Sequence, residues 1–228
     1  MGFGYNSGMH ETQQKILKFA SSYDLDKLKL REIGEMIGIP HPQVIKHHLE
    51  QLKKKGFLIK DTSTGILKPV YAGEVSQDKL VNIPILGNAN CGEATMIADE
   101  RLAGFLKVSK KLLKTEILNR TKDLFAVKAY GNSMNNASIP TTNNMLTNLE
   151  EGDYAIIDSS KKTPKTGDYI LSIIEGAANI KKYVDDKKHG QIVLISESTV
   201  NYPPIYIDQN MDYLVNGVVV QVIKSPKY

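Results

Sequence analysis

The chain has 228 residues, a net charge of +4 at pH 7, 41% hydrophobic residues and 24% charged residues, an ordinary composition for a globular protein. The length allows one large domain or two small ones. A single cysteine, Cys91, excludes an internal disulfide and a multi-cysteine zinc site. No apolar run approaches the roughly 20 residues of a membrane-spanning helix, and the first residues lack signal-peptide features, so we expect a cytoplasmic protein.

The first part of the chain has the pattern of three helices followed by a hairpin. The predicted helices cover residues 11–23, 30–37 and 42–55, and the predicted strands cover residues 57–60 and 66–71. A tight turn, Gly38-Ile39-Pro40-His41, separates the second helix from the third, and Pro42 suits the first position of a helix. This order predicts a winged helix-turn-helix over residues 1–71, with the third helix in the major groove of double-stranded DNA.

Charge on the third predicted helix supports this interpretation. Five lysines and one acid, Glu50, lie between Gln43 and Lys60, and such a face suits phosphate contacts. The alternative is a solvated helix end that the helix dipole favours. Gln43 has the geometry to read adenine and Lys46 to read guanine. The residues expected to contact DNA are His41, Gln43, Val44, Lys46, His47, Lys53 and Lys54.

Two histidine assignments accompany this prediction. His48 lies on the apolar face of the helix and is expected to be a core residue with its hydrogen bonds satisfied. His41 and His47 are six residues apart with no cysteine or carboxylate in register, which is not the spacing of a metal site. We therefore expect neither a metal nor a cofactor.

From residue 80 onward the pattern changes to short apolar runs separated by turn residues, after a polar linker at residues 72–79. The predicted strands are residues 81–86, 124–130, 154–158, 169–174, 179–184, 191–196, 205–208 and 213–223, and residues 103–119 are predicted to be partly helical. The fold class is therefore α+β with two domains, and the domain at residues 80–228 is a mostly antiparallel, curled sheet.

Ser133 follows a predicted strand and a glycine-led turn, in Ala-Tyr-Gly-Asn-Ser-Met (residues 129–134). Most serines in turns bond only to their own backbone. A serine that attacks an amide needs a base beside it, and a lysine can be that base only when burial keeps it uncharged. In Ile-Lys-Lys-Tyr (residues 180–183), period-two alternation puts Lys181 and Lys182 on opposite faces of a strand. A solvated charge is the ordinary state of either lysine.

Four stretches of the chain carry a family resemblance: residues 48–59 (His-Leu-Glu-Gln-Leu-Lys-Lys-Lys-Gly-Phe-Leu-Ile), 83–93, 129–139 and 179–183. Together they resemble the LexA-like, self-cleaving SOS repressors, whose S24-type peptidase domain uses serine and lysine. The resemblance implies that Ser133 is the nucleophile, Lys181 is the base and the Cys91–Gly92 bond is the substrate, with Lys182 as the alternative base. It also implies a homodimer on operator DNA and a RecA–single-stranded-DNA filament as the trigger.

This sequence departs from the resembled family at three places. Cysteine replaces the usual alanine before the scissile bond, and it is small enough for the same pocket. A redox-sensitive cleavage site and an ordinary loop cysteine are the alternatives for Cys91. The segment 141–148 is a polar insert after the serine, expected to be a surface loop. The residues of the third helix expected to face DNA bases differ from those usual in the family, which implies a non-standard operator.

The strongly β-forming residues 214–223 have two interpretations. We favour an exposed edge, hazardous in a monomer, that pairing in a dimer covers. The alternative is an interior strand. Two other functions remain open for the whole chain. One is a repressor whose peptidase fold serves only dimerisation or ligand sensing. The other is a peptidase acting on other proteins, against which the lack of a membrane segment and the internal Cys–Gly bond both argue.

Overall fold

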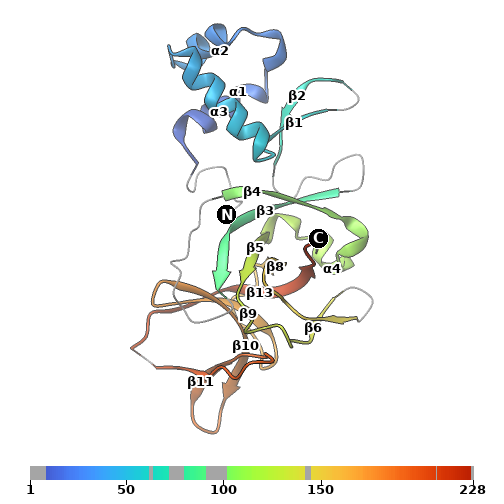
Figure 1. Ribbon diagram of the computed structural model, residues 1–228, viewed down its shortest axis with the longest axis vertical. Helices are drawn as coiled ribbons and strands as arrows, with labels where there is room; N and C mark the ends of the chain where they lie inside the picture. The colour runs from blue at the N-terminus through green and yellow to red at the C-terminus, as the bar shows by residue number, and fades with distance from the viewer. Residues whose placement is uncertain are drawn as a thin grey trace.

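The computed structural model describes residues 9–61, 64–71, 80–90, 102–141, 145–208 and 210–226, with the side chains of residues 88–90 and 102 excepted. A helical part precedes a β-rich part (Figure 1). The predicted linker at residues 72–79 and the predicted cleavage site, Cys91 and Gly92, lie outside the described residues. No helix within the described ranges is long and apolar enough to cross a membrane.

The helical part has the predicted order of three helices and a hairpin. Its elements are α1 (Glu11–Ala20), η1 (Leu25–Lys27), α2 (Leu30–Ile37), α3 (Pro42–Lys54), β1 (Leu58–Lys60) and β2 (Leu67–Pro69). The apolar faces of the helices meet in one core around Ile16, Ile33 and Ile45. α1 ends at Ala20, before the predicted end at residue 23, and leaves Tyr23 exposed.

The β-rich part is built on one nine-stranded sheet. Its strands are β3 (Leu80–Asn90), β4 (Leu102–Ser109), β5 (Leu124–Tyr130), β8 (Tyr154–Asp158), β9 (Tyr169–Ile174), β10 (Ala177–Asp186), β11 (Gln191–Ile195), β12 (Ile205–Ile207) and β13 (Tyr213–Ile223). The strand order is β12-β11-β10-β9-β13-β8-β5-β3-β4, with an additional pairing between β10 and β3. All neighbours are antiparallel except β3 with β5 and β3 with β10. The predicted α+β class with a mostly antiparallel sheet is confirmed.

One prediction about elements is confirmed only in part, and another was wrong. The segment predicted as partly helical begins with β4, which pairs with β3 along its length; helical turns follow only in η2 (Lys110–Leu112), α4 (Thr115–Leu118) and η3 (Thr121–Asp123). A short apolar run does not by itself distinguish helix from strand, and here the pairing with β3 decides. The prediction of a dimer edge was wrong: β13 lies between β8 and β9, so it is an interior strand and needs no partner copy to cover it.

The insert after the serine forms part of a small hairpin of β6 (Ile139–Pro140) and β7 (Leu146–Thr147). Residues 142–144 lie outside the described residues, while Met145 and Leu146 are exposed. Residues 145–148 of the insert are exposed or half-buried, as predicted for a surface loop, whereas Thr141 is buried.

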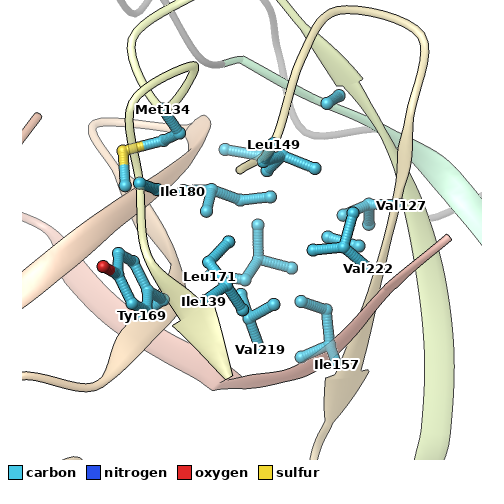
Figure 2. Packing of buried hydrophobic residues seen from close by; sticks show 14 of the residues in the cluster. Val127, Met134, Ile139, Leu149, Ile157, Tyr169, Leu171, Ile180, Val219 and Val222 are labelled. Carbon is cyan, nitrogen blue, oxygen red and sulfur yellow. The ribbon is translucent and has the colours of Figure 1, made fainter. Parts of the chain in front are cut away.

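One core cluster of the β-rich part lies under the serine-bearing loop (Figure 2). It includes Met134, Tyr169, Leu171 and Ile180, which come from a loop and from two neighbouring strands, β9 and β10. A second cluster lies around β3 and β8, and a third lies around Ile170. The first cluster holds the residues next to both predicted catalytic residues.

Candidate active site and DNA-binding face

Ser133 lies in the loop that follows β5. Gly131 leaves the strand with a φ of 83°, a left-handed backbone conformation that glycine adopts without steric cost. Ser133 and Met134 then turn inward, and both have 0% exposure to solvent. Because Met134 packs in the core cluster of Figure 2, the position of the serine is fixed from inside the domain. Residues 131–138 are called the serine loop below.

Lys181 lies on β10 and has only 3% of its surface exposed. Its Nζ forms a hydrogen bond with Ser133 Oγ at 2.6 Å, although the two residues are 48 positions apart in the chain. The same Nζ donates to the carbonyl oxygen of Ile180 at 3.3 Å. Ile180 belongs to the same core cluster as Met134. The structure thus brings the predicted nucleophile and base together, each beside a core residue.

Lys182 lies on the opposite face of β10, as strand alternation predicts. Its Nζ contacts Glu197 Oε1 at 2.6 Å, and its side chain is 34% exposed. It also lies 5.8 Å from the centre of the Tyr169 ring. Of the two neighbouring lysines, the one that contacts Ser133 is Lys181.

Glu197 connects Lys182 to Tyr169 and to the serine loop. The hydroxyl of Tyr169 donates to Glu197 Oε2 at 2.5 Å and accepts from the N–H of Ser138 at 2.9 Å. Burial and the bond to Glu197 raise the pKa of Tyr169 to about 12. Burial acts to raise the pKa of Glu197, but hydrogen bonds from Lys182 and Tyr169 and the charge of Lys182 outweigh it, so that pKa is lowered. The contact therefore joins a neutral phenol to a charged carboxylate.

Residues 197–199 make further hydrogen bonds to the serine loop. They are Asn136 N–H to Glu197 O at 2.9 Å, Ser198 Oγ to Asn132 O at 2.8 Å, Asn135 Nδ2 to Thr199 Oγ1 at 2.9 Å and Thr199 N–H to Asn135 Oδ1 at 2.9 Å. The loop is therefore held on both sides of Ser133 by a segment that follows β11.

The end of β3 lies beside the two strands that lead to the Ser–Lys pair. Asn90, its last residue, pairs in parallel with Tyr130 at the end of β5 and with Asn179 on β10. Tyr130 immediately precedes the serine loop, and Asn179 is two residues before Lys181, on the same face of the strand. The predicted cleavage site, residues 91–92, begins at the next residue of the chain.

Asn179 is a buried polar residue at this point, with 0% exposure. Its Nδ2 donates to the carbonyl oxygen of Ala177 at 3.0 Å, while its Oδ1 has no hydrogen-bond partner within the described part of the chain. Leaving a buried acceptor without a partner costs about 1–3 kcal/mol. An unused acceptor is thus retained on the strand of Lys181, next to the end of β3.

α3 presents the predicted DNA-binding residues to solvent. His41 is the N-cap residue and Pro42 the first residue of the helix. All seven predicted residues are exposed: His41, Gln43, Val44, Lys46, His47, Lys53 and Lys54. Ile45 and Leu52, on the opposite face, are fully buried. The exposed face of α3 is therefore available for a groove of DNA, and the individual base contacts stay predictions.

The prediction that His48 is a satisfied core residue was wrong. Its ring stacks on His10 with centroids 4.6 Å apart, but its buried Nδ1 has no hydrogen-bond partner in the described part of the chain. Burial, together with the nearby His10 and His47, lowers the pKa of His48. No group of three or more His, Cys, Asp or Glu within the described ranges is arranged to hold a metal ion.

A family model matches the β-rich part of the chain. The family described as Peptidase S24-like matches residues 84–220, more than half of the 228 residues. The chain belongs to the Peptidase S24-like family. In this S24-like chain the matched region contains Ser133, Lys181 and Glu197, and the helical part lies before it.

Curated relatives of this S24-like chain include LexA repressors, and matches that cover more than 90% of the chain extend over the helical part as well. The LexA repressor of Carboxydothermus hydrogenoformans is 28% identical over 215 residues, which cover 92% of this chain and 94% of the relative. That of Clostridium acetobutylicum is 28% identical over 180 residues, covering 78% and 80%. That of Geobacillus kaustophilus is 25% identical over 224 residues, covering 95% and 97%. The predicted resemblance to the LexA-like proteins is confirmed.

The sequence did not indicate a role for three residues of this S24-like site. Tyr169 looked like an ordinary strand residue, Glu197 follows a strand with no motif around it, and Asn179 lies at the start of a predicted strand. The contact between Tyr169 and Glu197 joins positions 28 residues apart. No local pattern predicts such a pairing, so only the fold reveals it.

Proposed function

We propose that this S24-like chain is a cytoplasmic transcriptional repressor of the DNA-damage response that cuts its own Cys91–Gly92 bond. It binds double-stranded operator DNA as a homodimer, and a RecA–single-stranded-DNA filament stimulates the cut. The relatives named LexA repressor support the repressor role. The observation that carries the self-cleavage is the 2.6 Å contact between buried Lys181 and Ser133.

The proposed reaction uses these two side chains in turn. Uncharged Lys181 takes the proton of the Ser133 hydroxyl while Oγ attacks the carbonyl carbon of Cys91. The bond from that carbon to the Gly92 nitrogen then breaks, and the proton on Lys181 passes to the leaving amine. Water hydrolyses the remaining ester, which leaves a carboxylate on Cys91 and restores Ser133. Burial of Lys181 supports this role because it disfavours the charged ammonium.

The position of the pair favours a substrate in the same chain over a separate protein. Ser133 is fully buried and Lys181 nearly so, so another protein would have to displace part of this domain to reach them. The end of β3 already pairs beside both strands of the pair, through Asn90 with Tyr130 and with Asn179. A bond that follows Asn90 in the chain needs no binding step.

The experiment is incubation of the purified protein at pH about 10, where lysine loses its proton even without help from burial. We expect two fragments that break at Cys91–Gly92, identified by mass spectrometry, and no cut in Ser133→Ala or Lys181→Ala. The matched controls are Ser138→Ala, an exposed serine of the same loop, and Lys188→Ala, an exposed lysine after β10. Both controls should cut at the wild-type rate.

Two outcomes would contradict the proposal. An uncut wild-type chain at every alkaline pH would leave the S24-like part as a dimerisation or ligand-sensing module. A Lys181→Ala chain that still cuts would remove this lysine as the base.

A further inference from the structure

β3 lies before the proposed cut in the chain, but the other strands of its sheet all come after the cut. It ends at Asn90, one residue before Cys91, so a cut after Cys91 leaves the whole strand on the N-terminal product. In the sheet, β3 lies between β4 and β5, both of which belong to the C-terminal product. It pairs with β4 from Leu80 opposite Ser109 to Leu86 opposite Leu102.

The side chains of β3 fill the core of the C-terminal product. Val81 and Ile83 have 0% exposure, and the rest of the buried cluster around them comes from residues after the proposed cut. These are Val108, Leu113, Ile117, Leu124, Ala126, Ile156 and Val220. Asn82 and Pro84, on the other face of the strand, are buried as well. The middle of β3 is therefore covered on both faces.

β4 depends on β3 for its place in the sheet. It is the last strand of the sheet, and within the described part of the chain β3 is its strand partner (Figure 1). Withdrawal of β3 would leave the backbone groups of β4 without their sheet hydrogen bonds and would expose an edge of β5. Unpaired strand edges are unfavourable and prone to aggregation, so the C-terminal product gains by keeping β3.

A second contact joins the same two products. Phe105 on β4 packs edge to face on Phe57 of the helical part, with ring centroids 5.2 Å apart. Next to Phe105, the backbones of the two segments lie close together: a Cβ at Gly104 would be 2.9 Å from the carbonyl oxygen of Lys55. β4 is thus contacted by the N-terminal product both through β3 and through the end of α3.

We infer that the cut by itself does not separate the two halves: the N-terminal product stays bound to the C-terminal product, with β3 as the docked segment and β4, β5 and the core around Ile156 as its binding surface. Release of the DNA-binding helices from the rest of the repressor then needs a second event that withdraws β3. The inference takes the position of the cut from the proposed function, but the strand arrangement does not depend on the catalytic roles.

The test uses a full-length Ser133→Ala chain with the recognition site of a sequence-specific protease inserted between Gly92 and Glu93. Added protease then makes the nick whether or not the protein cuts itself. The nicked protein is analysed by denaturing electrophoresis and by size-exclusion chromatography with light scattering at neutral pH. We expect two fragments on the denaturing gel and one native species with the mass of the uncut protein, at concentrations down to about 1 μM.

A matched pair of substitutions shows whether β3 holds the products together. Ile83→Ala truncates a fully buried isoleucine of β3, and Ile170→Ala truncates a fully buried isoleucine in a cluster made only of C-terminal residues. Both should lower the melting temperature of the uncut chain, because both leave a cavity. Only Ile83→Ala should raise the dissociation constant of the nicked protein, by at least tenfold. This constant is measured by diluting the nicked protein.

Separate elution of the two fragments of the nicked parent at micromolar concentration would overturn the inference. Equal effects of Ile83→Ala and Ile170→Ala on the dissociation constant would overturn β3 as the docked segment. Wild-type protein cut at alkaline pH and returned to neutral pH is analysed in parallel. If it fails to cut, the proposed function fails, while the protease-nicked protein still decides whether the products stay bound.

Discussion

Replacing Tyr169 with phenylalanine tests whether its hydroxyl holds the serine loop in place. The substitution removes the donor to Glu197 at 2.5 Å and the acceptor for the N–H of Ser138 at 2.9 Å. Ser138 is exposed, so water can replace that acceptor at little cost. The main loss is the hydrogen bond to a charged carboxylate, which contributes about 1.5–3 kcal/mol. We expect the free energy of unfolding to fall by about 2 kcal/mol.

The same loss should slow self-cleavage. If the serine loop must be ordered for Ser133 to reach its substrate, most of the lost free energy is also lost at the transition state. A change of about 1.4–2 kcal/mol corresponds to a rate that is about 10–30 times lower. The rate is read from fragment bands during incubation at alkaline pH, and the free energy of unfolding from urea denaturation of Tyr169→Phe in the Ser133→Ala background, which keeps the chain intact.

Tyr213→Phe is the matched control. The Tyr213 hydroxyl is also buried, but it has no hydrogen-bond partner within the described part of the chain, and burial raises the pKa of Tyr213 to about 12. Removing this hydroxyl should leave the free energy of unfolding unchanged or raise it, since no bond is lost. Equal losses in both variants, or a Tyr169→Phe protein that cuts at the wild-type rate, would refute the role given to Tyr169.

Three further predictions follow from the contacts of the site and of α3. Lys182→Ala should slow self-cleavage by less than about 10-fold, and Lys182→Arg should restore the rate because arginine pairs again with Glu197. Lys181→Arg, in contrast, should stay inactive because arginine does not lose its proton. Lys46→Ala should reduce the slope of log affinity against log salt concentration by about 1 on any DNA duplex, as measured by fluorescence anisotropy. Gln43→Ala should leave that slope unchanged and should alter the preference for DNA sequence. Because the folded protein lowers the pKa of Glu197 below its ordinary value of 4.5, the contribution of Glu197 to stability is complete above pH about 4.5 and is lost as the pH falls through the lowered pKa. Denaturation curves of Glu197→Gln should show a weaker dependence on acid pH, and an unchanged dependence would contradict the assignment.

Local patterns in the sequence predicted much of the fold. The helix-turn-helix follows from apolar spacing and from Pro42 at the start of α3, and these depend on neighbours within one or two turns. The opposite orientations of Lys181 and Lys182 follow from strand alternation alone. The choice of Lys181 over the other basic residues did not come from local physics; it came from resemblance to a family.

The features that the sequence did not predict depend on long-range pairing. Gly104 and the apolar residues of β4 fit a helix or a strand equally well, and the pairing with β3 selects the strand. β13 has the composition of an exposed or an interior strand, and its place between β8 and β9 decides between them. Glu197 is one of 25 acidic residues, and its role is defined only by its contacts with Tyr169 and Lys182.

The sheet order also bears on how the proposed cut is controlled. β3 reaches the strands of the Ser–Lys pair as part of the folded core, so in the proposed reaction a substrate bond that follows this strand in the chain is tethered at a high effective concentration. An activator therefore cannot act by raising the affinity for substrate. It has to change either the geometry of residues 91–92 or the ease with which Lys181 accepts a proton. These two routes differ in pH dependence. An activator that acts on geometry raises the cleavage rate equally at neutral and alkaline pH. An activator that acts on Lys181 raises the rate mainly at neutral pH, where the uncharged form of the lysine is scarce.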